Sequence, residues 1–359
     1  MTVYRSRRRC LVTTAGLLAA VLLLACSPGP GGAGQGPAPP AAPQPAEARV
    51  ETSRPAAPQK VRSAYTTISA AVASFWAALE AGYFSEQGLD VEMIRVDAGA
   101  PLLAALSNNE LDIVSAGGTS LVLGNLQGME AMIIGATSSV LDSSVFVRPE
   151  IQTIDDLRGK TIGVTNLKAI TDTAARLGLS RMGLQPDVDV FTRRTGGLAE
   201  SLAGMETGAL EGASLAVPVV FEARRRGYRE LVNVTELRIP FLNSAVGSTK
   251  KVLAERPEIA EPYLRALAQG SSRLKTDREF AIEVLGKYGR MDDRELLGAT
   301  VDYYQPLYQV DPYPDPATVQ TILDEEENPA ARTARPQDVI DDRFAARLRN
   351  SGFLDQLPK

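Results

Sequence analysis

The sequence contains no histidine and only two cysteines in 359 residues. Without histidine, the chain lacks the usual general base, the commonest metal ligand and the base of nearly every serine or cysteine triad. The cysteines, Cys10 and Cys26, both lie near the amino end, so the body of the protein has no disulfide and no thiol chemistry. We therefore expect a protein that is not an enzyme and that holds no metal and no cofactor.

Long apolar runs are also scarce, and the clearest one lies at the amino end. Four arginines within the first nine residues precede the uncharged run from Leu11 to Leu24, which has 14 residues. That length is short of the roughly 20 residues that span a bilayer and is typical of a signal-peptide core. The following Leu23-Leu24-Ala25-Cys26 resembles a bacterial lipobox, so we expect residues 1–25 to be a signal peptide and Cys26 to carry lipid. A plain signal peptide and a twin-arginine signal stay open as alternatives.

Residues 27–60 contain nine prolines and five glycines in 34 positions. A segment with so few large apolar residues cannot bury a core, so we expect residues 26–60 to be a disordered tether behind the lipid. As a flexible coil it would span about 30 Å. The acyl chains would anchor the protein to a membrane, and the tether would hold the folded body near the surface.

The formal charge of the full chain is −5, and it becomes −9 without the four arginines of residues 1–25. Nucleic-acid binding requires a basic face that neutralises phosphates. The charge therefore argues against a nucleic-acid partner.

After residue 60, short apolar strands alternate with amphipathic helices, the pattern of parallel-rich α/β sheets. The remaining 299 residues (359 minus 60) exceed one ordinary core and suit two α/β lobes. We expect lobe 1 at 61–148 and 245–359 and lobe 2 at 149–244. The two crossings, the segments in which the chain passes from one lobe to the other, are expected at 145–148 and 245–248. Expected strands lie at 61–66, 89–96, 112–116, 131–136, 161–164, 188–191 and 212–215. Expected helices lie at 70–81, 101–108, 119–127, 171–182, 198–207 and 218–226, and residues 250–351 are mostly helical and pack on lobe 1.

The two lobes share an internal correspondence. The segment from Asn109 to Ser115 matches that from Gly208 to Ser214, and in each a glycine follows the aligned leucine by 17 residues. Each copy reads as strand, turn and helix. The match favours two lobes with one building plan, although any two α/β units have similar lengths.

Several short motifs carry a resemblance to a known family. They are Gly82-Tyr83-Phe84, Gly88-Leu89-Asp90-Val91, Ala105-Leu106, Asp112-Ile113, the block from Asp156 to Val164, and Ser351-Gly352-Phe353-Leu354. Together they resemble the nitrate, sulfonate and taurine-type substrate-binding proteins of ABC importers, a group that includes pyrimidine-precursor binders. The resemblance implies a periplasmic-binding-protein type II fold (α/β, two lobes, central cleft) in a monomer on the periplasmic or extracellular face. It also implies delivery of a small polar or anionic solute to ABC permease subunits.

Ligands of α/β sheets lie beyond the carboxyl ends of strands, where loops lead into helix amino ends. The loops at these places hold hydroxyls, amides and glycines, which suit hydrogen bonding to a small polar ligand. Our candidate ligand-binding residues are Thr67, Ser69, Gly118, Thr119, Ser138, Asn166, Thr171, Pro218 and Asn243. Capping of the helices is the alternative role for each of them.

Charged candidates are few near these loops. Lys168, Arg193 and Arg194 are placed to neutralise a sulfonate or carboxylate, and Asp142 and Asp172 to bind an amine, with solvated charge as the alternative for each. For Phe75 and Trp76 the pattern favours core packing.

Two other functions stay open at this point. Relatives of the resembled family include a thiamine-pyrimidine synthase that uses histidine and lysine, and the missing histidine disfavours that alternative. A ligand-loaded partner of a sensor protein would show the same sequence features. The solute itself stays open among sulfonate, nitrate, carboxylate and pyrimidine-like compounds.

Overall fold

A computed structural model describes residues 3–4, 57–66, 68–96 and 99–358. The chain divides into one unit of Met1–Ser6 with Pro58–Lys359 and another of Arg7–Ala57. The predicted lipid attachment at Cys26 and nearly all of the predicted signal peptide and tether lie outside the described residues. Strand β2 already begins at Gln59, within the last two positions of the predicted tether.

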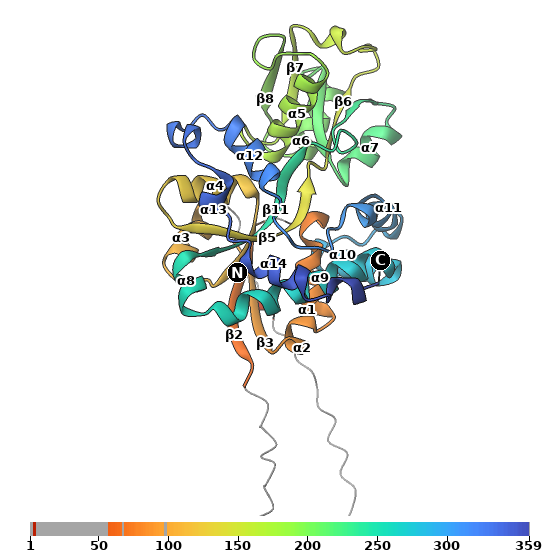
Figure 1. Ribbon diagram of the computed structural model, residues 1–359. Helices are drawn as coiled ribbons and strands as arrows, with labels where there is room; N and C mark the ends of the chain where they lie inside the picture. The colour runs from red at the N-terminus through yellow and green to blue at the C-terminus, as the bar shows by residue number, and fades with distance from the viewer. Residues whose placement is uncertain (1–2, 5–56, 67, 97–98, 359) are drawn as a thin grey trace, which may run out of the picture. The chain divides into compact units, whose positions relative to one another are not determined.

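The first sheet has the strand order β1-β3-β2-β4-β11-β5 (Figure 1). β2 pairs in parallel with β3 and β4, β11 pairs antiparallel with β4 and β5, and β1 pairs antiparallel with β3. Every residue of β4 is buried, as expected of a strand covered on both faces. The strands are β1 (Val3–Tyr4), β2 (Gln59–Tyr65), β3 (Leu89–Arg95), β4 (Ile113–Ala116), β5 (Ala131–Val140) and β11 (Pro240–Thr249). The helices between them are η1 (Ala70–Val72), α1 (Ala73–Glu80), α2 (Tyr83–Glu86), α3 (Gly99–Ser107) and α4 (Gly118–Leu126).

The second sheet has the strand order β10-β6-β9-β7-β8, and lies with its helices in the upper part of Figure 1. β7 is parallel to β8 and β9, whereas β6 is antiparallel to β9 and β10. Its strands are β6 (Ser143–Val147), β7 (Lys160–Val164), β8 (Val190–Arg194), β9 (Gly212–Ala216) and β10 (Arg229–Asn233). Its helices are η2 (Asp155–Leu157), α5 (Ile170–Arg181), α6 (Leu198–Glu206) and α7 (Val219–Arg225).

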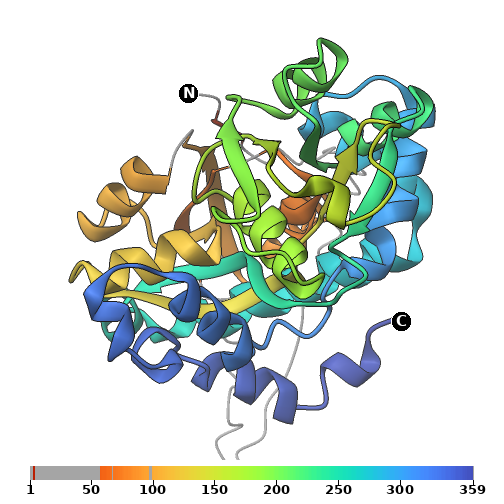
Figure 2. The same ribbon diagram turned by 90° about the horizontal axis from the view of Figure 1, so that it is seen from above.

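The helices after β11 pack on the first sheet and its helices, as predicted. α9 lies against α1, α12 against β11, and α14 against α9 and β5, and Figure 2 shows this layer from above. The helices are α8 (Lys250–Glu255), η3 (Pro257–Ile259), α9 (Ala260–Thr276), α10 (Arg278–Gly289), α11 (Arg294–Tyr304), η4 (Gln305–Leu307), α12 (Pro316–Glu325), η5 (Pro329–Arg332), α13 (Pro336–Val339), α14 (Arg343–Asn350) and η6 (Leu354–Gln356).

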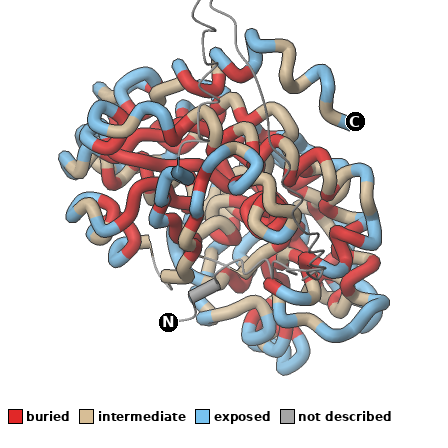
Figure 3. Tube along the Cα trace, turned by 90° about the horizontal axis from the view of Figure 1, so that it is seen from below, coloured by how far each residue is buried: buried red, intermediate tan, exposed pale blue. Residues whose placement is uncertain are grey.

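The contact between α1 and α9 is close because Gly270 has no side chain. A Cβ atom at Gly270 would lie 2.6 Å from the Ser74 carbonyl oxygen and 2.9 Å from the Ala78 nitrogen. Trp76, fully buried on α1, stacks on Tyr288 with ring centroids 5.7 Å apart. Phe75 is also fully buried, so both aromatic residues pack in the core, as predicted. Figure 3 shows buried backbone concentrated through the sheets and their covering helices.

The two crossings between the sheets do not lie where the sequence pattern placed them. β5 ends at Val140 in the first sheet and β6 begins at Ser143 in the second, so the first crossing is residues 141–142. The second crossing is residues 234–239, between β10 and β11. The predicted crossings at 145–148 and 245–248 are therefore wrong, because 145–147 pair within β6 and 245–248 pair within β11.

The internal correspondence is confirmed by matched geometry in the two copies. Asn109 and Gly208 both have left-handed backbone, with φ of 59° and 74°. In the first copy the Asp112 carboxylate accepts a hydrogen bond from the Arg62 backbone N–H at 2.7 Å. In the second copy Glu211 accepts one from the Thr161 backbone N–H at 3.1 Å. Each acid thus binds the backbone of the neighbouring parallel strand, so the two sheets repeat one local plan.

Candidate functional site

A cavity of about 250 Å³ lies between the two sheets, and segments of both sheets line it. One wall comes from the carboxyl ends of β2 and β4, and another from the ends of β7 and β9, as the rule for α/β sheets predicts. The crossings contribute Asp142 and the start of β11 contributes Asn243 and Ser244. The described lining residues are Thr66, Ile68, Ser69, Ala71, Val72, Ala116, Gly117, Asp142, Ser143, Thr165, Ile170, Thr171, Leu198, Ala216, Val217, Asn243 and Ser244.

Three helices direct their amino ends toward this cavity. The N-cap Gly117 of α4 lines it, as do the first residues of α5 and α6, Ile170 and Leu198. None of the three N-cap residues accepts a hydrogen bond with its side chain. The first N–H groups of a helix lack intrahelical partners and carry a partial positive charge. These ends therefore suit hydrogen-bond acceptors on a ligand.

A polar wall lies at the first crossing. Asp142 is buried, with 6% of its surface exposed, and it accepts a hydrogen bond from the Tyr304 hydroxyl. Burial raises the pKa of Asp142, and the hydrogen bond from Tyr304 opposes that shift. Beside it, the Asn243 amide also favours the ionised form of Asp142 and so opposes the rise of its pKa, whereas the buried Ser143 Oγ has no hydrogen-bond partner among the described residues. Buried polar atoms without partners are rare in folded proteins, so this wall is suited to a polar ligand.

Two adjacent tyrosines on α11 bind both crossings. Tyr304 donates its hydroxyl hydrogen to Asp142 in the first crossing. The Tyr303 hydroxyl lies 2.8 Å from the Thr235 hydroxyl in the second crossing. The two rings meet edge to face with centroids 5.4 Å apart. One helix of the first sheet's layer therefore contacts both crossings.

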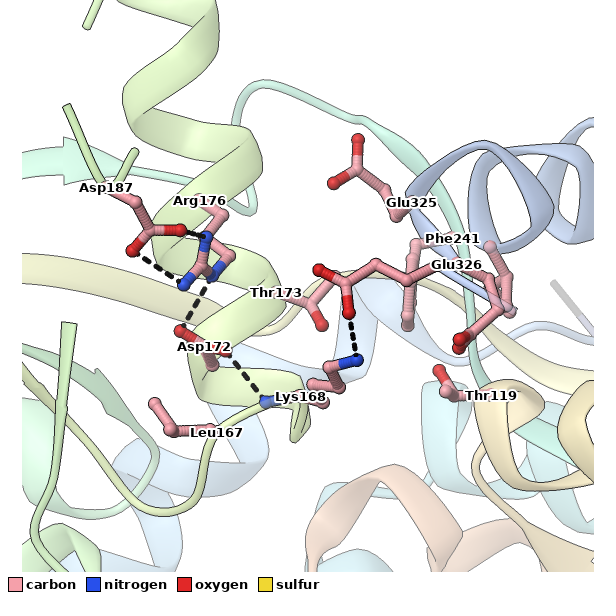
Figure 4. Close-up of a pocket in the computed structure, with 12 residues that line it drawn as sticks. Thr119, Leu167, Lys168, Asp172, Thr173, Arg176, Asp187, Phe241, Glu325 and Glu326 are labelled. Atoms are coloured by element: carbon pink, nitrogen blue, oxygen red, sulfur yellow. Dashed lines mark hydrogen bonds and ion pairs between the residues drawn. The ribbon is translucent and has the colours of Figure 1, made fainter. Parts of the chain in front are cut away.

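A second pocket of about 280 Å³ lies nearby and is rich in charge (Figure 4). Lys168, on the loop between β7 and α5, forms an ion pair of 2.7 Å with Glu327, which follows α12. Arg176 lies between Asp172 and Asp187, with ion pairs of 3.1 and 2.6 Å, as Figure 4 shows. Both cations lining this pocket are therefore already paired with acids of the protein. The Lys168–Glu327 pair also joins the second sheet's loop to the helical layer of the first.

The nine predicted ligand-binding residues divide into groups by position. Ser69, Thr171 and Asn243 line the first cavity, and Thr119 lines the second pocket. Gly118 begins α4 beside the lining Gly117, and a Cβ atom there would lie 2.6 Å from Leu242 Cβ and the Leu242 carbonyl oxygen. Ser138 lies within β5, Asn166 precedes α5 and Pro218 caps α7, and none of these three lines either pocket. Thr67 lies outside the described residues.

Capping, the alternative role, is visible at Ser69, whereas Thr171 bonds to the loop that precedes its own helix. The Ser69 hydroxyl accepts a hydrogen bond from the Ala71 N–H at 3.2 Å. The Thr171 hydroxyl accepts one from the Thr165 N–H at 3.0 Å. Both residues hold the backbone at the cavity edge, and direct contact with a ligand stays a prediction.

The charged candidates lie outside the first cavity, except for Asp142. Lys168 and Asp172 line the second pocket, where each forms an ion pair. Arg193 and Arg194 lie in β8 at the edge of the second sheet, and Arg193 donates a hydrogen bond to the Ala209 carbonyl. No predicted cation thus reaches the first cavity. Sequence reasoning missed Ser143 and Tyr304, which no local pattern marks.

The described part of the chain lacks two features. Within it, no group of three or more acidic, histidine or cysteine side chains has an arrangement that could hold a metal ion. No helix there is both long and apolar enough to cross a bilayer.

Comparisons with known proteins agree with this geometry. A family model described as "NMT1/THI5 like" matches residues 69–279. No curated protein sequence matches the chain significantly.

Solved structures of periplasmic binding proteins share the fold. The aliphatic sulphonate-binding protein SsuA of Escherichia coli has a TM-score of 0.68 at 17% identity, over 79% of this chain and 92% of that protein. The alkanesulfonate-binding SsuA of Xanthomonas axonopodis pv. citri, solved with MOPS, has a TM-score of 0.62 at 18% identity, over 80% and 99%. The nitrate-binding NrtA of Synechocystis PCC 6803 has a TM-score of 0.65 at 14% identity, over 84% and 91%. The predicted fold class, α/β of the periplasmic-binding-protein type, is confirmed.

Proposed function

Because the chain belongs to the NMT1/THI5-like family, we propose that it is the solute-binding component of an ABC importer. It binds a small polar molecule between its two sheets and delivers that molecule to the permease subunits. Its place is the periplasmic or extracellular face of a membrane. There, after residues 1–25 are removed, lipid on Cys26 anchors it and the proline-rich segment tethers the folded body.

The observation that supports this role is the cavity between two sheets joined by two crossings. A ligand in it contacts residues of both sheets and so favours the closed arrangement over an open one. The Lys168–Glu327 ion pair lies between the same two parts and adds a contact that exists only when they are close. Binding followed by release through opening is what delivery to a permease requires.

The lining chemistry supports binding rather than catalysis. Among the described lining residues there is no lysine or cysteine, and the chain has no histidine. The hydroxyls of Ser143, Thr165 and Ser244 thus have no base of these kinds beside them. The division into two lobes, with the crossings at 141–142 and 234–239, is part of the same proposal.

The test is to identify a bound solute and follow closure. Native mass spectrometry of the full chain, purified without denaturation, should show an endogenous small molecule. At a concentration 100-fold above its Kd, that molecule should add about 2.7 kcal/mol to the free energy of unfolding. For roughly 300 residues this raises Tm by about 4 °C. Small-angle X-ray scattering should show a smaller radius of gyration with the solute.

A matched pair of variants locates the effect. Thr165→Trp fills the first cavity and should abolish the stabilisation, whereas Thr173→Trp, in the second pocket, should retain it. A broad screen of small solutes that produces neither stabilisation nor compaction contradicts the proposal.

A further inference from the structure

The proposed cavity contains one ionisable side chain. Of the described lining residues, only Asp142 carries a titratable group, and the remaining polar ones are serines, threonines and one asparagine. The nearest pocket with cations uses both of them internally, Lys168 with Glu327 and Arg176 with Asp172 and Asp187. Among the described residues that line the cavity, a ligand therefore meets one carboxyl group and no cationic side chain.

We propose, on the basis of the function above, that the ligand carries an amine or amidine nitrogen whose N–H groups bind the Asp142 carboxylate. Solutes that present only an anionic group are accordingly not its ligand.

The surroundings of Asp142 support a donor at this point of the ligand. Tyr304 on α11 donates a hydrogen bond to the buried carboxylate, and the Asn243 amide also favours its ionised form. No lysine or arginine among the described residues that line the cavity compensates the charge. A buried carboxylate without a cationic partner is costly, and a nitrogen with N–H groups is the complement that it lacks.

Polar atoms beside Asp142 indicate which groups the adjacent part of the ligand should carry. The Asn243 amide lies beside Asp142, and the residue is 5% exposed. Ser143 Oγ is fully buried, has no hydrogen-bond partner among the described residues, and can donate or accept. The amino ends of α4, α5 and α6 also reach the cavity and favour acceptors on the ligand. The site thus fits a molecule with a nitrogen donor on one edge and acceptors around it.

An inorganic oxyanion or a simple sulfonate fits less well. It would satisfy the helix ends but would place negative charge near Asp142, and the ionised form of Asp142 repels like charge. The solved relatives bind sulfonate or nitrate according to their descriptions, so this chain differs from them in ligand class.

The experiment uses pairs of probes that differ by one amino group. They are propionate and 3-aminopropionate, ethanesulfonate and 2-aminoethanesulfonate, and pyrimidine and 4-aminopyrimidine, with nitrate as a further anion. Binding to the full chain is measured by calorimetry and by thermal shift, and native mass spectrometry identifies any co-purified solute. We expect the amino member of at least one pair to bind more tightly than its partner, and any co-purified solute to contain an amine or amidine.

Asp142→Asn tests the residue itself. It removes the charge while keeping an oxygen that accepts from Tyr304, and it should weaken binding of the amino probe by at least about tenfold. Asp90→Asn, at an exposed position of β3, should change nothing. If Asp142→Asn does not fold, the probe pairs and the co-purified solute on the unmodified chain still decide the question.

The outcomes separate the inference from the function on which it rests. Binding of ethanesulfonate, propionate or nitrate, unchanged or improved by Asp142→Asn, overturns the inference and leaves the solute-binding role intact. A co-purified solute without an amine or amidine nitrogen also overturns the inference and leaves the solute-binding role intact. No binding by any probe together with no co-purified solute counts against both.

Discussion

The hydroxyl groups of Tyr304 and Tyr308 offer a matched test of how the first crossing is held. Both side chains are buried, 2% and 4% exposed, and their rings stack with centroids 6.1 Å apart. Tyr304 donates to the buried Asp142, whereas the Tyr308 hydroxyl has no hydrogen-bond partner among the described residues. Phenylalanine preserves the ring packing at either position, so each substitution removes only a hydroxyl.

The two substitutions should have different effects on the free energy of unfolding. A hydrogen bond to a charged group contributes about 1.5–3 kcal/mol, so Tyr304→Phe should lower the free energy of unfolding by that amount when Asp142 is ionised. For roughly 300 residues this is a fall in Tm of about 2–5 °C. Tyr308→Phe removes a buried group without a partner and should be neutral or stabilise by up to about 1 kcal/mol.

The pH dependence has a definite sign. Burial raises the pKa of Asp142 in the folded protein, so its contribution to stability is present at pH below its unfolded pKa and is lost as pH rises through the folded pKa. Losing the Tyr304 hydroxyl removes a donor that favours the ionised form and raises that pKa further. The cost of Tyr304→Phe should therefore be smaller at about pH 4 than at about pH 8.

Urea unfolding of the three proteins at both pH values measures these differences, provided that the slope with urea is unchanged. Equal destabilisation by Tyr304→Phe and Tyr308→Phe would refute the reasoning, because the effect would then belong to the aromatic layer and not to the Asp142 bond. A cost that is larger at the lower pH would contradict the assigned titration.

Two other predictions concern the helical layer and the amino end. Gly270→Ala should lower the free energy of unfolding by about 3 kcal/mol, because the new methyl group meets backbone atoms of Ser74 and Ala78. Gly289→Ala has open space around its new Cβ atom, so it should be neutral or stabilise by up to about 1 kcal/mol. Thermal unfolding distinguishes the two, and equal effects would show that α1 and α9 can separate without cost. Cys26→Ala should move the expressed protein from the membrane fraction to the soluble fraction, measured by fractionation and by mass spectrometry of the amino terminus. Retention in the membrane by the alanine variant would argue against lipid at Cys26.

Local periodicity predicted seven of the strands, but it did not predict β6, β10 or β11, and it misplaced the crossings. Leu141 and Asp142 are buried and follow β5 directly, so their burial does not separate them from the strand. β11 extends from Pro240 to Thr249, and its pairing with β4 and β5 determines where the chain changes sheets. Such pairing joins segments about 100 residues or more apart, which a short window of sequence cannot report.

The sequence indicated the place of the cavity in the fold, but it did not predict the contact between Asp142 and Tyr304 in the polar wall. The rule that ligands lie at the carboxyl ends of strands indicated Ser69 and Thr171, and both line the cavity. The partnership of Asp142 with Tyr304 joins residues that are 162 positions apart. It also depends on how α11 packs over the crossing, for which no spacing motif exists.

The three helix amino ends at the cavity have a consequence for how ligand preference can change during evolution. Their positive character belongs to the backbone, so it persists whatever side chains the loops acquire. The opposing negative charge belongs to one side chain at position 142. We therefore expect substitution at position 142 to be a short mutational route between cationic and anionic ligands, with the fold unchanged.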